Sequence, residues 1–362
     1  MTDGQESNWR TTTLGNLATL QYGRSPTLIT KTEGEYDLIG TSGVLRRVGE
    51  FLCDTPSVVI GRKGTIDNPI YADRPFWATD TTYYTLFDKS LDPKWFYYQI
   101  SAIDLTKYNE ASGVPSLGRE TLNSIALQVP PLDEQKKIAE ILTTVDEVIE
   151  NTEAEISKLE YLKKATMNEI LTKGIGHTEF KETEIGRIPK SWKIVSMRDV
   201  CDINYGKAPN HKDENEGNYP IIGTGGVIGR SNEYLCKHES VVIGRKGTID
   251  KPIHVDAPFW PIDTTYYVSC KKVDCRWLWY RLQFENLAKY NEASGVPSLS
   301  RETLYSIKLQ LPSDREQKAQ VNVLDQISVR LTELRDRLRR IRAVKIGVMQ
   351  DLLTGKVRVK VN

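Results

Sequence analysis

The sequence lacks the features that mark several large classes of protein. It has only five cysteines among 362 residues, an odd number with no C-x-x-C pair, which argues against a disulfide framework or a zinc ribbon. No stretch approaches the ~18 uninterrupted apolar residues of a membrane-spanning helix, and the first residues contain no apolar core of a secretion signal. We therefore expect a cytoplasmic protein with reduced thiols that does not span a membrane.

An excess of charge of either sign is also absent. The 49 Lys and Arg residues face 48 Asp and Glu residues, for a formal net charge of +1. Any contact with nucleic acid must therefore come from local basic clusters and not from a global positive field. The 39% of hydrophobic residues is enough to build packed cores, and the length predicts two domains of about 100–200 residues each.

The chain contains the same unit twice. The run SVVIGRKGTID occupies residues 57–67 and returns at 240–250, and 32 of 49 positions are identical between Tyr36–Tyr84 and Tyr219–Tyr267. A second run, KYNEASGVPSL, occupies residues 107–117 and returns at 289–299. Two copies of one unit therefore fill the chain, joined by a polar, glycine-containing linker.

Each copy has two parts. The first is rich in Val, Ile, Thr, Tyr and Gly with short strand-like runs, which predicts a mainly β domain with some helix, so the fold class is α+β. The second is a long helical segment, for which Asp133 and Asp314 are the expected N-caps. We predict a first domain at 1–132, a first long helix at 133–173, a linker at 174–191, a second domain at 192–312 and a second long helix at 313–356.

Apolar residues in the two long segments recur in alternating steps of three and four, as in a coiled coil. In the first segment they include Ile156, Leu159 and Leu162, with Thr152 interrupting, and in the second Leu331, Leu334 and Val344. Residues 133–173 hold 6 basic and 10 acidic residues, whereas residues 314–356 hold 10 and 6. Opposite charge favours pairing of the two helices with each other; the alternative is that each helix packs only on its own domain.

Catalytic motifs are missing. The sequence has no G-x-x-x-x-G-K-[ST] phosphate loop, no Asn-Pro-Pro-Tyr or Asp-Pro-Pro-Tyr element of amino-methyltransferases and no H-E-x-x-H metal motif. We therefore predict a protein that is not an enzyme, with no catalytic residue, no cofactor and no metal. A nuclease that binds magnesium through Asp67 and Asp80 is one rival, and a coiled-coil adaptor that binds protein without reading DNA is the other.

The order of several short motifs resembles the specificity subunit of type I restriction-modification systems. These motifs lie at residues 23–26, 59–64, 79–84, 113–117 and 129–135, and return at 206–209, 242–247, 262–267, 295–299 and 311–317. The resemblance implies two target-recognition domains separated by two long helices in an antiparallel coiled coil with pseudo-two-fold symmetry. Each domain would read one half of a bipartite DNA target in double-stranded DNA. The helices would dock two methyltransferase (modification) subunits, and a restriction translocase-nuclease would join through the complex.

The repeated turn Gly-Arg-Lys-Gly-Thr is the first candidate for DNA contact, because two cations between glycines suit a turn that approaches a phosphate or a guanine. The repeated Lys-Tyr-Asn-Glu-Ala-Ser-Gly segment is the second, and the Arg-Glu-Thr-Leu segment the third. The candidate DNA-binding residues are Arg62, Lys63, Gly64, Thr65, Lys107, Asn109, Ser112 and Arg119, with Arg245, Lys246, Gly247, Thr248, Lys289, Asn291, Ser294 and Arg301. The alternatives are ordinary hairpin turns and helix ends with solvated charges.

The identity of these motifs predicts a target that is an interrupted palindrome or close to one. Direct repeats on antiparallel helices would face DNA as inverted copies, and 15 of 16 residues match between Lys107–Leu122 and Lys289–Leu304. The copies differ between Thr27–Glu33 and Asn210–Glu216. They differ also where Arg46, Asn68 and Tyr71 are replaced by Gly229, Lys251 and His254. If those positions read bases, the half-sites differ there.

Overall fold

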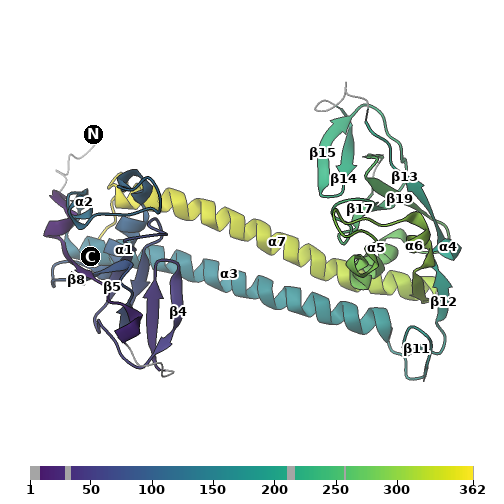
Figure 1. The fold of residues 1–362 in the computed structure, drawn as a ribbon, viewed down its shortest axis with the longest axis horizontal. Coiled ribbons are helices and arrows are strands. Elements are labelled where there is room, and N and C mark those ends of the chain that lie inside the picture. Colours follow the sequence, from purple (N-terminus) through teal and green to yellow (C-terminus); the bar gives the residue numbers. More distant parts are fainter. Residues whose placement is uncertain (1–8, 29–33, 210–216, 257, 362) are drawn as a thin grey trace. The chain divides into compact units, whose positions relative to one another are not determined.

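The protein forms two compact units that both contain parts of two long helices. A computed structural model describes residues 9–28, 34–209, 217–256 and 258–361 (Figure 1). The first unit comprises the chain up to Glu153 and from Asp336 onward, and the second comprises Ala154–Arg335. The helices α3 (Leu132–Thr172) and α7 (Asp314–Leu353) each contribute to both units.

The first unit holds a domain built on a four-stranded antiparallel sheet of order β2-β8-β5-β6, beside a three-stranded sheet β4-β3-β7 and the pair β1-β9. Its elements are β1 (Arg10–Thr13), β2 (Ala18–Tyr22), β3 (Tyr36–Gly40), β4 (Gly43–Val48), β5 (Ser57–Gly61), β6 (Ile70–Ala72), β7 (Phe76–Ala78), β8 (Thr82–Phe87), α1 (Pro93–Ser101), α2 (Arg119–Asn123) and β9 (Ala126–Val129). Strand β5 is buried at every position, as its Val-Val-Ile run between two neighbouring strands requires.

The second unit repeats this plan. Its sheets are β13-β19-β16-β17, β15-β14-β18 and the pairs β12-β20 and β10-β11. Its elements are β10 (Phe180–Lys181), β11 (Ile188–Pro189), β12 (Lys193–Ser196), α4 (Met197–Val200), β13 (Cys201–Tyr205), β14 (Tyr219–Gly223), β15 (Gly226–Ser231), β16 (Ser240–Gly244), β17 (Ile253–Val255), β18 (Trp260–Pro261), β19 (Thr265–Cys270), α5 (Cys275–Glu285), α6 (Arg301–Ser306) and β20 (Lys308–Leu311). The strand registers match as well, with Val59 opposite Tyr84 and Val242 opposite Tyr267.

Each domain core closes on one end of both long helices. In the first unit Trp95 and Tyr98 of α1 pack with Ile138 and Leu142 of α3 and with Leu352 of α7. In the second, Trp277 and Leu278 of α5 belong to one cluster with Ile170 and Leu171 of α3 and Leu324 of α7. The helices are therefore part of the cores and not additions to them.

A glutamate and a glutamine lock the start of each long helix to its domain. In α3 the Glu134 carboxylate accepts hydrogen bonds from Trp9 (3.0 Å) and from two nitrogens of Arg358 (2.7 Å each). The side chain of Gln135 accepts from the Asp92 N–H (2.9 Å) and donates to the Pro130 carbonyl (2.9 Å).

The same lock recurs in α7. Glu316 accepts from Trp192 (2.8 Å), and Gln317 accepts from the Asp274 N–H (2.9 Å). The two helices begin at equivalent positions, Leu132 and Asp314. The expected N-caps are wrong, because Asp133 and Asp314 lie inside the first turn, where carboxylates favour the positive end of the helix dipole.

Within each unit the segments of α3 and α7 run antiparallel. In the first unit Lys345 pairs with Asp146 (2.5 Å) and Arg342 with Glu153 (2.6 Å). In the second unit Gln320 donates to the Ile170 carbonyl (2.7 Å) and Arg330 pairs with Glu155 (3.1 Å). Every α3–α7 ion pair among the described residues has its cation on α7, as the charge counts predicted.

None of the described helices is long and apolar enough to cross a membrane.

The helix seam matches the prediction at Ile156, Leu331 and Leu334, which are buried, and departs from it at three other positions. Thr152 does not interrupt the seam but is buried in it, with its hydroxyl donating to the Val148 carbonyl (2.7 Å). Leu162 and Val344, predicted to lie in the seam, are 50% and 58% exposed. Lys163 turns inward instead, where burial lowers its pKa and its ammonium lies over the Tyr280 ring.

We predict that Glu134→Gln destabilises the first unit by about 1–3 kcal/mol at neutral pH, because it weakens the three hydrogen bonds that the carboxylate accepts. Burial acts to raise the pKa of Glu134, but the hydrogen bonds from Arg358 and Trp9 outweigh it and lower this pKa. The contribution is therefore complete above about pH 4.3, the ordinary glutamate pKa, and fades as pH falls through the lower folded value. Urea unfolding at several pH values measures it.

The matched control is Glu140→Gln, an exposed acid on the same helix that pairs with Lys137. It should cost less than about 0.5 kcal/mol. A Glu134→Gln deficit that stayed constant from pH 7 to pH 3 would contradict the role given to the charge.

Candidate nucleic-acid interface

The Gly-Arg-Lys-Gly turn follows the buried strand β5 and depends on both glycines. A Cβ on Gly61 would lie 2.0 Å from the Thr65 carbonyl oxygen, which is far inside contact distance. Gly64 has φ +97°, in the left-handed region that side chains disfavour. Gly244 and Gly247 repeat both constraints, with a 2.1 Å approach and φ +92°. The turn is therefore a fixed backbone shape shared by both domains.

This turn and the second candidate segment form one structure. The Gly64 N–H donates to the Pro115 carbonyl (2.9 Å), the Leu117 N–H donates to the Arg62 carbonyl (3.0 Å), and Lys63 faces Ser116 in an isolated β-bridge. In the second domain Gly247 donates to Pro297 (2.8 Å) and Leu299 donates to Arg245 (3.0 Å). Two motifs that the sequence separates by about 50 residues thus make a single surface in each domain.

In each domain a buried tyrosine donates a hydrogen bond to the backbone of this junction. The buried Tyr83 hydroxyl donates to the Leu117 carbonyl (3.1 Å), and Tyr266 donates to Leu299 (3.1 Å). Burial raises the pKa of both tyrosines to about 12, so each hydroxyl keeps its proton for this bond.

Asn109 holds its own loop in shape. Its side-chain oxygen accepts from the N–H groups of Ala111 (3.1 Å) and Ser116 (2.9 Å), and its amide nitrogen donates to the Ala111 carbonyl (2.8 Å). Asn291 makes the same three bonds in the second copy. Both ends of each amide are therefore engaged within the loop, where these asparagines hold the backbone in shape.

Two arginines flank one tyrosine in each domain. The guanidinium carbons of Arg62 and Arg119 lie 5.5 and 5.3 Å from the centroid of the Tyr22 ring. Those of Arg245 and Arg301 lie 5.8 and 5.0 Å from the Tyr205 ring. The aromatic rings, each 46% exposed, hold two cations near each other at the surface. We call each set an Arg–Tyr–Arg cluster.

The cations of the turn have no acidic partner. Within the described part of the chain, Arg62, Lys63, Arg245 and Lys246 form no ion pair and no side-chain hydrogen bond. The Nε groups of Arg62, Arg245 and Arg301 are buried without a hydrogen-bond acceptor. Arg119 lies 3.8 Å from Glu120, an exposed pair of small energy. An anion could therefore bind the turn cations through the exposed lysines and through guanidinium nitrogens other than these buried Nε groups.

The other predicted residues divide into two groups. Thr65, Ser112 and Ser294 lie at the surface of the same loops, and Thr248 is half-buried there. Lys107 forms an ion pair with Asp104 (3.6 Å), and Lys289 forms one with Glu285 (2.5 Å). These two lysines are less available to an external anion than the turn cations.

The tyrosines of the two clusters, Tyr22 and Tyr205, were not among the residues predicted from the sequence. Tyr22 and Tyr205 stand at equivalent positions, immediately before the motifs that begin at Gly23 and Gly206. Their repetition was a signal available in the sequence. What it could not reveal is that the end of β2 lies beside the turn after β5, because strand β8 separates the two strands in the sheet.

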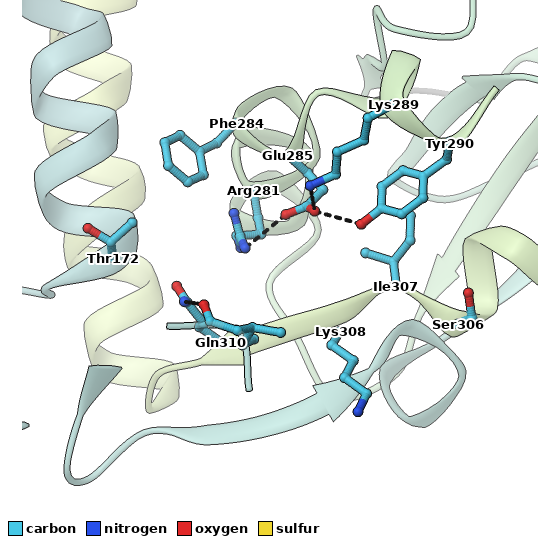
Figure 2. A pocket seen from close by; sticks show the side chains of 11 residues that line it. Thr172, Arg281, Phe284, Glu285, Lys289, Tyr290, Ser306, Ile307, Lys308 and Gln310 are labelled. Carbon is cyan, nitrogen blue, oxygen red and sulfur yellow. Dashed lines mark hydrogen bonds and ion pairs between the residues drawn. The ribbon is translucent and has the colours of Figure 1, made fainter. Parts of the chain in front are cut away.

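A pocket of about 500 Å³ lies in the second unit, where Lys289 and Tyr290 at the start of the repeated segment form part of its lining (Figure 2). Arg281 and Glu285 of α5 form a buried ion pair (2.9 Å), and the Glu285 carboxylate also binds Lys289 and the Tyr290 hydroxyl. Arg281 and Glu285 correspond to Gln99 and Ile103 in the first copy. The buried ion pair of this pocket is therefore not shared by the two domains.

One group of metal-binding residue types occurs among the described residues, with ligand atoms of Glu239, His254 and Cys275 within 4.8 Å of one another. His254 is already bonded on both ring nitrogens, to Glu239 (2.6 Å) and to Arg276 (3.1 Å). The equivalent residues in the first copy are Pro56, Tyr71 and Pro93. The group is thus a polar contact that joins β17 to α5.

Both halves of the chain are similar to known proteins. The sequence profile of the type I restriction modification DNA specificity domain matches residues 6–161 and 189–340. The specificity subunit of the type I restriction enzyme MjaVIII from Methanocaldococcus jannaschii is 28% identical, over 75% of this chain and 72% of that protein. The EcoDI specificity subunit from Escherichia coli is 22% identical, over 88% of this chain and 81% of that protein.

The fold agrees with a solved structure. The crystal structure of a type I restriction-modification S subunit from M. genitalium superposes with a TM-score of 0.72, over 98% of each chain at 16% identity. The α+β architecture with two similar domains and two long helices is thus confirmed as a known fold.

We predict that Asn109→Ala loosens the first loop without unfolding the domain. It removes three hydrogen bonds, each worth about 1 kcal/mol net, so the amides of Ala111 and Ser116 should exchange with solvent at least about fivefold faster. Hydrogen exchange followed by mass spectrometry measures this, with the intact Asn291 loop as the internal reference. Ser112→Ala, in the same loop, is the control and should change little. Unaltered exchange in Asn109→Ala would refute the positioning role.

Proposed function

The chain belongs to the type I restriction modification DNA specificity family, and from this membership we propose that each of its two domains reads one half of a bipartite DNA target. Specificity subunits are the non-catalytic members of their complexes, so the chain supplies recognition and other subunits supply chemistry. In this proposal the long helices dock two methyltransferase subunits, and a translocase-nuclease joins through the assembled complex.

The Arg–Tyr–Arg cluster beside the Gly-Arg-Lys-Gly turn is the observation that carries the proposal. Four cations in the first domain, Arg62, Lys63, Arg119 and the more distant Lys107, lie in one set of joined loops, and the turn cations have no acidic partner among the described residues. Phosphate contacts by such cations supply most of the affinity of DNA-binding proteins. The same cluster in the second domain supports a second, equivalent contact.

The two clusters support a target whose halves resemble each other. The turn, the tyrosine and both arginines are the same residues in both domains, as are the backbone bonds that join turn and loop. A target that is an interrupted palindrome or close to one matches this identity. Departures from it would arise where the copies differ, and residues 29–33 and 210–216, which differ most, lie outside the described residues.

Exposed apolar residues at equivalent helix positions support docking of two methyltransferase subunits. Leu162 of α3 and Val344 of α7 correspond to each other in the repeat and are 50% and 58% exposed. Tyr161 beside Leu162 is 77% exposed, and Ile346 near Val344 is 69% exposed. Large apolar side chains on both helices, outside the seam, fit a surface that a partner covers in the complex.

We predict that Arg62→Ala with Lys63→Ala weakens DNA binding by the assembled complex at one half-site, and that Arg245→Ala with Lys246→Ala weakens it at the other. Each lost phosphate contact should reduce the slope of log affinity against log salt by about 1, and a lost base contact costs about 1–3 kcal/mol. Titration of labelled duplexes at several salt concentrations measures both effects.

The matched control is Arg74→Ala with Lys89→Ala. Strand register places Arg74 after β6 and Lys89 after β8, both beyond the strand ends opposite the turn. This pair should leave the affinity nearly unchanged. A quadruple variant of the turns that bound DNA as tightly as the unaltered complex would make the turns ordinary hairpins. Absence of salt-dependent DNA binding altogether would favour a protein-binding adaptor.

We predict that Leu162→Glu and Val344→Glu each remove one methyltransferase subunit, and that the double variant removes both. A buried carboxylate without a partner is strongly disfavoured at such an interface. The mass of the co-purified complex measures the stoichiometry. Val329→Glu is the control, because Val329 is 56% exposed and its counterpart in the repeat is already Glu147. Full assembly of the double variant would contradict docking at these positions.

A further inference from the structure

The two hairpins β3–β4 and β14–β15 lie beside the Gly-Arg-Lys-Gly turns. A Cβ on Gly64 would be 3.6 Å from the Thr41 hydroxyl oxygen, and one on Gly247 would be 3.6 Å from that of Thr224. Both threonines lie in the two-residue connections of the hairpins. Figure 1 shows β14 and β15 as neighbouring strands at the edge of the second domain. Each hairpin tip is thus adjacent to the proposed DNA contact.

The hairpin tips expose apolar side chains next to cations. Val44 and Leu45 are 56% and 55% exposed, and their counterparts Val227 and Ile228 are 65% and 60% exposed. Strands β4 and β15 are edge strands of three-stranded sheets, so no neighbouring strand covers them. An exposed apolar edge is a liability unless a partner covers it in use. A two-stranded ribbon of this kind fits the major groove of DNA.

The strongest difference between the two tips is one arginine. Arg46 stands opposite Leu38 in the first hairpin, and Gly229 stands opposite Ile221 at the same register in the second. The next arginine in each hairpin already has a partner in the chain. Arg47 lies 3.6 Å from Asp37. Arg230 donates to the carbonyls of Gly217 (2.7 Å) and Asn218 (2.8 Å). Arg46 is exposed and has no ion pair or side-chain hydrogen bond within the described ranges.

The two other differences named in the sequence analysis, at Asn68 and Tyr71, lie elsewhere. Tyr71 lies under the Lys94 ammonium (4.2 Å) and, with Asn68, lines a hollow against Thr143 and Asp146 of α3. Its counterpart His254 contacts Arg276 of α5 (3.1 Å). These residues face the helices of their own units. Of the three named differences, Arg46 is therefore the one that lies in the hairpin whose tip adjoins the proposed DNA contact.

Resting on the proposed function, we propose that Arg46 is a specificity-determining residue that reads a guanine in the first half-site, a position that Gly229 leaves unread in the second. The guanidinium fork matches the O6 and N7 acceptors of guanine in the major groove. The apolar tip residues Val44 and Leu45 fill the groove beside it, as Val227 and Ile228 do in the other domain. The half-sites then share the contacts of the common turns and differ at the Arg46 position.

The test is a reciprocal exchange, Arg46→Gly and Gly229→Arg, in the full chain assembled with the methyltransferase of its system. Selection from a pool of duplexes with randomised half-sites, followed by sequencing, measures base preference. Arg46→Gly should lose a guanine preference of roughly fivefold to a hundredfold at one position of one half-site. Gly229→Arg should create a guanine preference at the matching position of the other.

Two controls separate this role from others. Arg46→Lys keeps the charge without the fork and should lose most of the preference, whereas Arg74→Gly should leave the selected sequences unchanged. If Arg46→Gly lowers affinity equally for all sequences with a shallower salt slope, Arg46 contacts phosphate and the proposal is wrong. If it changes only binding of the methyltransferase, the hairpin is a protein contact and the proposal is equally wrong. A lack of DNA binding by the unaltered complex would instead overturn the proposed function itself.

Discussion

The backbone pairing between the Gly-Arg-Lys-Gly turn and the Gly-Val-Pro loop is the constraint on which the candidate interface depends. The Gly64 N–H reaches the Pro115 carbonyl only because a positive φ turns the chain at that residue. Because Gly61 has no side chain, the Thr65 carbonyl can approach it closely and complete the turn. Arg62 and Lys63 are thereby presented by a rigid junction and not by a mobile hairpin, which lowers the entropy lost when they bind an anion.

Cation placement in the interface follows from packing more than from charge. The chain has almost no net charge, so local arrangement decides where positive potential lies. Tyr22 and Tyr205 are each contacted by two arginines. Glu110 and Glu292 accept hydrogen bonds from threonine hydroxyls of the following helices and form no ion pair with the turn cations. The glutamates therefore stabilise the loop, and the cations of the turn remain available to an external anion.

The long helices have one face in the seam and a second face that is exposed. One face forms the seam, where α7 supplies the cations and α3 the acids, so that the two helices prefer each other over copies of themselves. The locks at Glu134 and Glu316 fix the start of each helix against its domain. A second face leaves Leu162 and Val344 exposed at equivalent positions, which is the basis for proposing two equivalent partners.

The sequence by itself determined the duplication, the α+β class, the two long helices and their charge complementarity, because these are properties of local pattern and of identity between copies. Only the tertiary structure decided that two motifs about 50 residues apart form one surface, since this depends on which carbonyl each N–H reaches. It also showed that Asn109 holds its own loop in shape, that Thr152 lies inside the seam and that Leu162 and Val344 lie outside it. The heptad pattern alone permits both phases there, and the choice rests on packing against the partner helix and α5.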